Sequence, residues 1–403
     1  MGLEILKYSS LFESLTRFIY YLLGRRGPPP KSELELLPLL PEELVVEILS
    51  CLPVKSLMRF KSVSKSWKSL MSDSQLVKLH LHRSFCRMNA DFSHVRFVTE
   101  CDIHNSGSSS YVSPRSMTSL LERADTEAES ADISGYRLIG VCNGLICLKS
   151  TKFRRKYCYH TVYFWNPATR SLSSSPTLRS FGDFGFGYDS STDTYKVVHV
   201  YPEQTALHVY KMGDNCWRTI HLFPAPNWIL RLPSYSYSVS NTINWLGEMF
   251  SENDTDLIDC CYKIVSFDLG KPKYTQLALP FCYGEEDIDN YFKPILGVLR
   301  GCLCISENNK TRNFALWQMK EFGVHQSWTK LFSINGSEKI LAWPCFAISV
   351  FDNGDALLLS VSRANGVLYT LRDSKLERKK IADEVRFYYA ENYIESLVLP
   401  KFK

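Results

Sequence analysis

The residue types that could do chemistry are present, but their spacing matches no known catalytic pattern. Phe184–Gly187 (FGFG) has the glycines of a phosphate loop but lacks the strand-to-helix context that such loops need. No Gly-x-Ser-x-Gly, His-Glu-x-x-His or Walker sequence occurs. The acidic run Glu285–Asp287 lies in a polar stretch, where we expect it to be solvated. The sequence therefore predicts a chain with no catalytic residue and no cofactor, although a site assembled from distant loops would leave no such pattern.

The cysteines and histidines do not suggest a metal centre. The chain has 13 cysteines and nine histidines, but no Cys-x-x-Cys pair, so we expect no zinc site. Cys302 and Cys304 alternate, as two residues on one face of a strand do. The cysteine spacings are irregular and no secretory signal is recognised before them, so we expect reduced thiols in a protein of the cytoplasm, the nucleus or both.

Length and charge set the next limits. The 403 residues allow two or three domains, and 45% hydrophobic and 22% charged residues are ordinary for globular protein. The net charge of +5 is mild for this length, so we expect no nucleic-acid partner.

Residues 1–36 are predicted to form an amphipathic segment followed by a proline-rich linker. An apolar stripe at helical spacing runs from Leu11 to Leu23, and Pro28–Pro30 then favours a stiff, extended chain. The continuous apolar run Phe18–Leu23 is too short to span a bilayer, so we expect no stable membrane insertion. A loosely packed, dispensable helix is favoured over a helix that binds a membrane surface or a partner.

The stretch 40–67 is the element around which the chain is organised. Pro41 suits the first turn of a helix, and Leu44, Ile48 and Leu52 then recur at intervals of four residues. Pro53 ends this helix because its ring disfavours helical geometry in the residue before it. Two further short helices are predicted to follow. Three helices in about 35 residues cannot bury this much apolar side chain alone, so we expect part of it to contact a partner.

This stretch resembles the F-box, position by position. In the F-box family a three-helix module binds Skp1, the adaptor of a cullin-RING ubiquitin ligase. The resemblance implies an F-box domain at 37–84, although an ordinary amphipathic helical bundle is the simpler alternative. It also implies a Skp1-binding surface made from the residues that match the family's pattern. These are Leu40, Pro41, Leu44, Ile48, Leu49, Leu52, Pro53, Val54, Leu57, Val63, Lys65 and Trp67.

Beyond residue 134 the pattern changes to short strands between turn residues, and it repeats. Aromatic-rich strands recur about 45–58 residues apart, the span of one propeller blade of the kelch size class. No long helices intervene, which argues against a parallel α/β sheet. Five units follow one another from about residue 134 to residue 381. We predict that Tyr393–Leu399 pairs with strands from 94–133 to make a sixth, composite blade, since an open apolar edge would invite aggregation.

The second half also resembles a family, the plant F-box-associated domain, often described as kelch-type. The matching motifs are Cys142–Leu145 (CNGL), Trp165–Arg170 (WNPATR), Phe186–Asp189 (FGYD) with Tyr195–Val198 (YKVV), and Leu316–Met319 (LWQM). The resemblance implies an all-β propeller over 94–400. The chain departs from true kelch repeats in one respect, because it has no regular Gly-Gly doublet. We expect Trp165, Trp217 and Trp328 to fill the space between blades.

Together the two resemblances imply a multi-domain protein with a small all-α F-box followed by an all-β propeller of six blades. They imply the substrate-recognition subunit of an SCF-type E3 ubiquitin ligase. The F-box would bind a Skp1-like adaptor and through it the cullin-RING complex, and the propeller would bind a protein substrate for ubiquitination and proteasomal degradation. The residues that bind the substrate are unknown from sequence. One alternative is a Skp1-binding adaptor or ligand receptor that acts without ubiquitination; another is a propeller enzyme with an incidental F-box.

Overall fold

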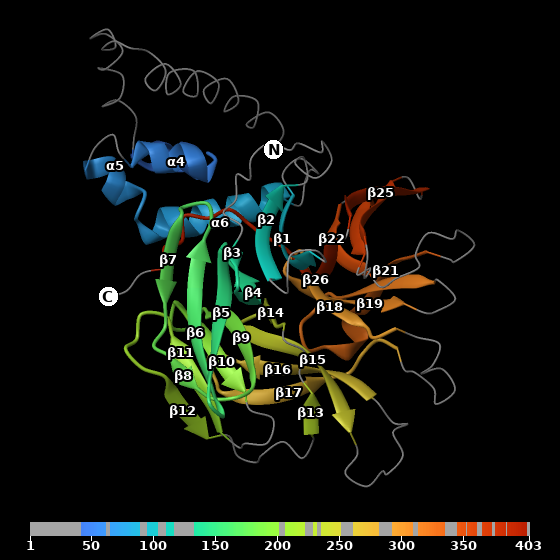
Figure 1. Cartoon of the computed structure of the whole chain (residues 1–403). Coiled ribbons are helices and arrows are strands. Elements are labelled where there is room, and N and C mark those ends of the chain that lie inside the picture. Colours follow the sequence, from blue (N-terminus) through green and yellow to red (C-terminus); the bar gives the residue numbers. More distant parts are fainter. Residues whose placement is uncertain are drawn as a thin grey trace. The chain divides into compact units, whose positions relative to one another are not determined.

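The structure is a computed structural model, coloured along the chain in Figure 1. It describes residues 42–61, 65–88, 95–103, 110–116, 133–200, 206–221, 229–231, 235–250, 261–281, 292–308, 313–334, 345–351, 353–360, 365–372, 375–383 and 385–400. The chain divides into two compact units, Met1–Arg83 and Ser84–Lys403. The predicted segment 1–36 lies outside the described residues, as do Leu40, Pro41 and Val63. No helix among the described residues is both long and apolar enough to cross a membrane.

The first unit contains the predicted short helices. They are α3 (Glu42–Ser50), α4 (Val54–Phe60), α5 (Lys65–Leu70) and the start of α6 (Ser74–Met88). Pro53 occupies the N-cap position of α4 with extended backbone angles, so the first helix ends before it, as predicted. Asp73 caps α6, because its Oδ1 accepts hydrogen bonds from the backbone N–H groups of Gln75 and Leu76 at 2.8 and 3.1 Å.

The second unit is a six-blade β-propeller in which five blades follow one another along the chain (Figure 1). Blade 1 has β4 (Arg137–Cys142), β5 (Leu145–Arg154), β6 (Tyr157–Asn166), β7 (Ser171–Ser174) and β8 (Leu178–Arg179). Blade 2 has β9 (Asp183–Asp189), β10 (Thr194–Val200), β11 (Ala206–Lys211) and β12 (Arg218–His221). Blade 3 has β13 (Ile229–Arg231), β14 (Tyr237–Val239), β15 (Thr242–Phe250), β16 (Cys261–Asp268) and β17 (Lys273–Leu277). Blade 4 has β18 (Ile295–Leu299), β19 (Cys302–Asn308), β20 (Phe314–Met319), the 3₁₀ helix η4 (His325–Ser327) and β21 (Trp328–Ile334). Blade 5 has β22 (Cys345–Val350), β23 (Ala356–Ser360), β24 (Asn365–Arg372) and β25 (Lys375–Asp383).

The sixth blade is composite, as predicted, but a different strand closes it. β26 (Val385–Asn392) pairs antiparallel with β1 (Arg96–Ile103), and β2 (Ser110–Ser116) and β3 (Ile133–Ser134) complete the sheet. The prediction that Tyr393–Leu399 is the closing strand is therefore wrong. The two segments are both rich in apolar residues, and the register with β1 selects the earlier one. Residues 393–400 continue beyond the strand without regular secondary structure.

The inner strands of the blades lie side by side around the ring, in the order β4, β9, β14, β18, β22 and β26. Blades 3 and 6 are therefore opposite each other. Tyr235 and Tyr237, from blade 3, lie 4.8 and 5.7 Å from Tyr389 of β26, measured between ring centroids. Aromatic side chains thus meet across the axis of the propeller and fill its centre at this level.

Indole groups link neighbouring blades, as predicted for Trp217 and Trp328. Trp217 Nε1 donates to the carbonyl of Pro176 in the preceding blade at 2.8 Å, and Trp328 Nε1 donates to the carbonyl of Ala278 at 3.2 Å. Trp165 is buried in the largest apolar cluster of the propeller. A further indole, that of Trp245, donates to the carbonyl of Phe184 at 3.3 Å. An indole N–H group therefore donates a hydrogen bond between blades 1 and 2, between blades 2 and 3, and between blades 3 and 4.

Candidate functional site

The predicted Skp1-binding residues of the first unit fall into two groups by exposure. Leu44 is 36% exposed, Ile48 is half-buried and Pro53 is exposed. They lie on α3 and at the start of α4, where an apolar surface can contact another protein. Lys65 and Trp67 belong to α5, but their side chains lie outside the described part of the chain.

The other group lies inside the module. Leu49, Leu52, Val54 and Leu57 are buried, as are Met71 and Leu76 of the same unit. Their exposed fractions are 6% or less, so they contribute chiefly to holding the helices together. The helical stripe that predicted the site is wider than one face, so it contains both core residues and surface residues.

Two polar residues of α6, not predicted as part of the site, fix the end of α3. The buried ring of His80 lies 2.9 Å, through Nε2, from the carbonyl oxygen of Leu52. Arg83 Nη1 donates to the Glu47 carbonyl at 2.7 Å and to Ser50 Oγ at 2.6 Å, and Arg83 Nη2 contacts the Glu47 carboxylate. The positive charge of this guanidinium also interacts favourably with the negative, C-terminal end of the α3 dipole. From its residue type we expect His80 at the surface, but it lies four residues after the buried Leu76, on the same face of α6, and packing within the unit buries it.

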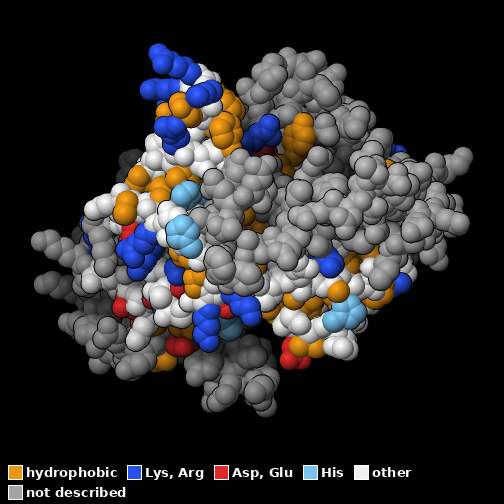
Figure 2. All heavy atoms as spheres, turned by 90° about the horizontal axis from the view of Figure 1, so that it is seen from below, with side chains coloured by type: hydrophobic (Ala, Val, Ile, Leu, Met, Phe, Trp, Pro, Cys, Tyr) orange, Lys and Arg blue, Asp and Glu red, His pale blue; other side chains and the backbone are white. Residues whose placement is uncertain are grey.

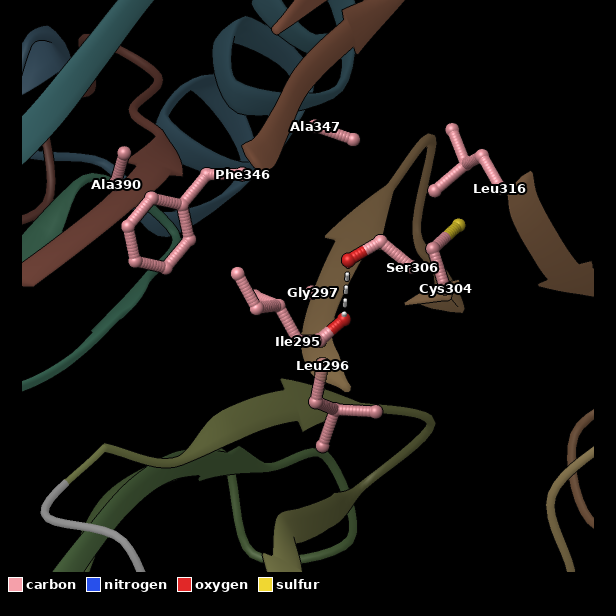
Figure 3. Close-up of a pocket in the computed structure, with 9 residues that line it drawn as sticks. All are labelled: Ile295, Leu296, Gly297, Cys304, Ser306, Leu316, Phe346, Ala347 and Ala390. Carbon is pink, nitrogen blue, oxygen red and sulfur yellow. Dashed lines mark hydrogen bonds between the residues drawn. The ribbon is translucent and has the colours of Figure 1, made fainter. Parts of the chain in front are cut away.

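A pocket among the described residues of the propeller is too small to hold a ligand. Figure 3 shows a pocket between β18, β19 and β22, lined by Ile295, Phe346 and Ala390 among others. Its volume is about 10 Å³, the room of a single water molecule. Ser306 Oγ lies 3.4 Å from the carbonyl oxygens of Ile295 and Cys345, so its hydroxyl has acceptors within the protein. This pocket is a small packing defect where blades 4, 5 and 6 meet.

A group of polar side chains between blades 1 and 2 is the nearest approach to catalytic chemistry. Cys158 Sγ lies 3.2 Å from His160 Nε2, and His160 Nδ1 lies 3.0 Å from Thr151 Oγ1. Burial lowers the pKa of His160 to about 4 and raises the pKa of the Cys158 thiol. The pair is therefore a neutral imidazole and a protonated thiol, which is the wrong charge state for a nucleophile.

The histidines of this group pack as aromatic rings. His199 stacks on His208, with ring centroids 5.7 Å apart, and meets Phe184 edge-on at 4.6 Å. Burial lowers the pKa of His199 to about 3, so its ring is uncharged at neutral pH. No three histidine, cysteine or acidic side chains in the described ranges are arranged to hold a metal ion. The geometry of this group supports a structural role.

The end of the β5–β6 hairpin of blade 1 is an exposed cationic feature of the propeller surface. Residues 152–156 (KFRRK) are exposed, and Phe153 alone is 75% exposed. The hairpin reaches the lower side of the propeller in Figure 1, and Figure 2, seen from that side, shows Lys and Arg side chains gathered with hydrophobic ones. The run of cations is visible in the sequence, but only the extended hairpin shows that it stands clear of the blade.

Comparison with known proteins agrees with this division of the chain. A family model for the F-box domain matches residues 37–79, and one for the F-box associated beta propeller domain matches residues 95–377. An F-box/kelch-repeat protein of Arabidopsis thaliana is 31% identical over 310 residues, which cover 74% of this chain and 80% of that protein. F-box protein CPR1, also of Arabidopsis thaliana, is 24% identical over 393 residues, or 89% of each chain.

The propeller match alone covers more than half of the chain, and it runs from before β1 into β25, the last strand of blade 5. The F-box match includes α3, α4 and α5. The chain therefore belongs to the plant F-box proteins that carry a C-terminal F-box-associated β-propeller domain.

Proposed function

We propose that this chain is the substrate-recognition subunit of an SCF-type E3 ubiquitin ligase. Its F-box would bind a Skp1-like adaptor, its propeller would bind a protein substrate, and the complex would direct that substrate to ubiquitination and proteasomal degradation. The observation that carries the proposal is the presence in one chain of an F-box, matched at 37–79, and of an F-box-associated propeller, matched at 95–377.

In this function the chain is a receptor and not a catalyst. The cullin-RING complex, recruited through the adaptor, supplies the chemistry, and this chain contributes proximity between substrate and ubiquitin-charged enzyme. The filled propeller axis and the neutral Cys158–His160 pair agree with such a role. We propose the cytoplasm, the nucleus or both as its location.

The adaptor interface is tested best at an exposed residue. Leu44→Asp places a charge on the surface of α3, where it would be desolvated in the complex, so we expect at least about tenfold weaker binding to the adaptor with the fold retained. Leu52→Asp is unsuitable, because Leu52 is buried and its loss would unfold the module. Leu172→Asp, at a leucine of β7 that is 56% exposed, is the matched control.

The measurement is capture of the full-length chain by an immobilised Skp1-like adaptor, with circular dichroism to verify folding. Unchanged capture of a folded Leu44→Asp protein would count against the adaptor interface. Capture of the adaptor without cullin would favour the alternative of an adaptor or ligand receptor without ubiquitination. Proteins that accumulate on the chain when the proteasome is inhibited would identify the substrate.

A further inference from the structure

The β5–β6 hairpin leaves one backbone edge open. β4 pairs with β5 only as far as Arg137 opposite Lys149, whereas β6 pairs with β5 to Arg154 opposite Tyr157. Among the described residues, Ser150–Arg154 therefore has a neighbouring strand on one side only. An edge of this kind presents unpaired N–H and C=O groups to any strand that approaches it.

In blade 3 the equivalent edge is paired with an additional strand. Its strand β15 extends past β14, and residues Glu248–Phe250 pair antiparallel with Ile229–Arg231 of β13. β15 and β5 are both the second strands of their blades, so the two extensions are equivalent. In blade 1 the described part of the chain supplies no strand in the place that β13 takes in blade 3.

Four cations lie at the end of the β5–β6 hairpin, next to the open edge of β5, and a fifth lies in β8 on the far side of β6. Lys152 lies opposite Tyr159 in β6, and Tyr159 lies opposite Arg179 in β8, so these three side chains share one face. Arg179 also lies over the ring of Tyr157, 3.5 Å from its centroid. None of the five forms an ion pair within the described ranges. They are Lys152, Arg154, Arg155, Lys156 and Arg179.

The cations alone would also protect an edge, because like charges discourage pairing between copies of the chain. Phe153 argues against a purely protective role. It lies between Lys152 and Arg154 on the opposite face of the strand, and it is 75% exposed. An exposed aromatic ring on an edge invites contact, and next to cations it offers an apolar anchor for an incoming strand.

We propose that the edge Ser150–Arg154 binds an extended acidic segment of the protein substrate by strand addition. Acidic side chains at alternate positions of that segment face Lys152 and Arg154, and an apolar residue between them lies on the Phe153 face. The backbone supplies the strand pairing, and the charges supply the selectivity. The identity of the partner as a substrate rests on the proposed function, but the binding itself needs no adaptor.

The test is fluorescence anisotropy with the full-length chain and a labelled heptapeptide that alternates glutamate with valine. A peptide of the same composition, with the glutamates in one block and the valines in another, is the control for pattern. The alternating peptide is expected to bind about tenfold more tightly, because only it places every carboxylate on the cationic face. Added salt is expected to weaken its binding.

Two pairs of variants separate charge from backbone. Lys152→Glu with Arg154→Glu is expected to weaken binding of the alternating peptide by about tenfold or more. The matched control, Lys375→Glu with Arg378→Glu, changes two exposed cations of the edge strand β25 and is expected to leave binding within about twofold.

For the backbone, Arg154 and Tyr157 flank a two-residue turn and pair with each other, so the N–H of the alternate residue Phe153 faces outward. Phe153→Pro removes this donor and the ring, whereas Phe153→Ala removes the ring alone. If the peptide binds by strand addition, the Phe153→Pro protein should bind the alternating peptide about fivefold more weakly than the Phe153→Ala protein does.

Equal affinity for the alternating and the block peptide would overturn the proposal. So would an affinity of the Lys152→Glu, Arg154→Glu protein for the alternating peptide equal to that of the unchanged protein. So would binding seen only after the acidic residues between Glu122 and Asp132 are neutralised, which would assign the edge to this chain's own segment. Tighter binding of a single-stranded RNA oligonucleotide through the same residues would assign it to nucleic acid. Loss of peptide binding with intact adaptor capture would leave the receptor function standing, so the two proposals fail separately.

Discussion

The side-chain amide of Asn166 donates a hydrogen bond of 2.9 Å to the carbonyl of Ser396, 230 residues further along the chain. The same amide donates to the carbonyl of Val398 at 2.7 Å, while Asn166 Oδ1 accepts from the N–H of Ala168 at 3.0 Å. Asn166 therefore closes the turn after its strand and also holds residues 393–400 against blade 1. The ends of the propeller are joined twice, by β26 in the composite blade and by this C-terminal segment.

We expect Asn166→Ala to destabilise the propeller by about 1–3 kcal/mol, because buried hydrogen-bonding groups lose their partners. Truncation after Asn392 is expected to cost more, because it also removes the buried side chains of Tyr393 and Leu397. The truncation leaves β26 whole, so the ring should still fold. Urea denaturation of the unchanged protein, the two single variants and the double variant gives a double-mutant cycle. If Asn166 acts through the C-terminal segment, Asn166→Ala costs less in the truncated protein; strict additivity would contradict this coupling.

Glu391 makes the stability of the propeller depend on pH. Burial raises the pKa of this carboxyl to about 8, although hydrogen bonds from the Tyr389 hydroxyl and the Val141 backbone oppose the shift. The unfolded chain releases this proton near the ordinary pKa, so from about pH 4.5 to about pH 8 only the folded state holds it and stability falls as pH rises.

The unfolding free energy of the unchanged protein should decrease between about pH 5 and about pH 8. In Glu391→Gln this decrease is expected to be smaller, by a few kcal/mol at most. Urea denaturation at both pH values measures it, and Glu377→Gln, at an exposed position of β25, is the control. An unchanged pH dependence in the Glu391 variant would show that this carboxyl does not hold its proton in the fold.

Gly185 is needed because of Trp245, not because of a phosphate. A Cβ on Gly185 would overlap Cζ2 of Trp245 and would lie 2.5 Å from Cγ2 of Ile243. Gly185→Ala is expected to destabilise the propeller by about 1–3 kcal/mol through overpacking. Gly297→Ala, at an inner-strand glycine where a Cβ would have nothing within 4 Å, should be neutral or slightly stabilising. Thermal unfolding of both variants tests the difference, and equal melting temperatures would refute the steric explanation.

The F-box unit offers a comparison within one helix. His80 is buried against the Leu52 carbonyl, whereas His82, two residues later in α6, is exposed. His80→Ala removes the partner of a buried carbonyl and is expected to cost about 1–3 kcal/mol, and His82→Ala should cost less than about 0.5 kcal/mol. Hydrogen exchange of the α3 amides is the measurement. Similar exchange rates in the two variants would show that the His80 contact does not stabilise α3.

Several features of the chain follow from local sequence. Pro53 ends the first helix wherever the helix packs, because its ring acts on the residue beside it. Asn143 and Gly144 form a tight turn with φ angles of 50° and 79°, which these residue types adopt most readily. The spacing of the strands likewise predicted five sequential blades, since each blade is one local unit of antiparallel strands.

What depends on distant partners could not be derived in the same way. Val385–Asn392 and Tyr393–Leu399 are both rich in apolar residues, and only the register with β1 decides that the first closes the ring. The stripe of α3 marks apolar residues, but packing within the unit buries Leu49 and leaves Leu44 exposed. The cations of 152–156 are plain in the sequence. The open edge beside them exists because the pairing of β4 with β5 ends at Arg137 opposite Lys149, whereas β5 continues to Arg154. Local interactions determine the elements and their turns; which edge is paired and which face is buried is a property of the assembled ring, because it depends on strands that lie far apart in the chain.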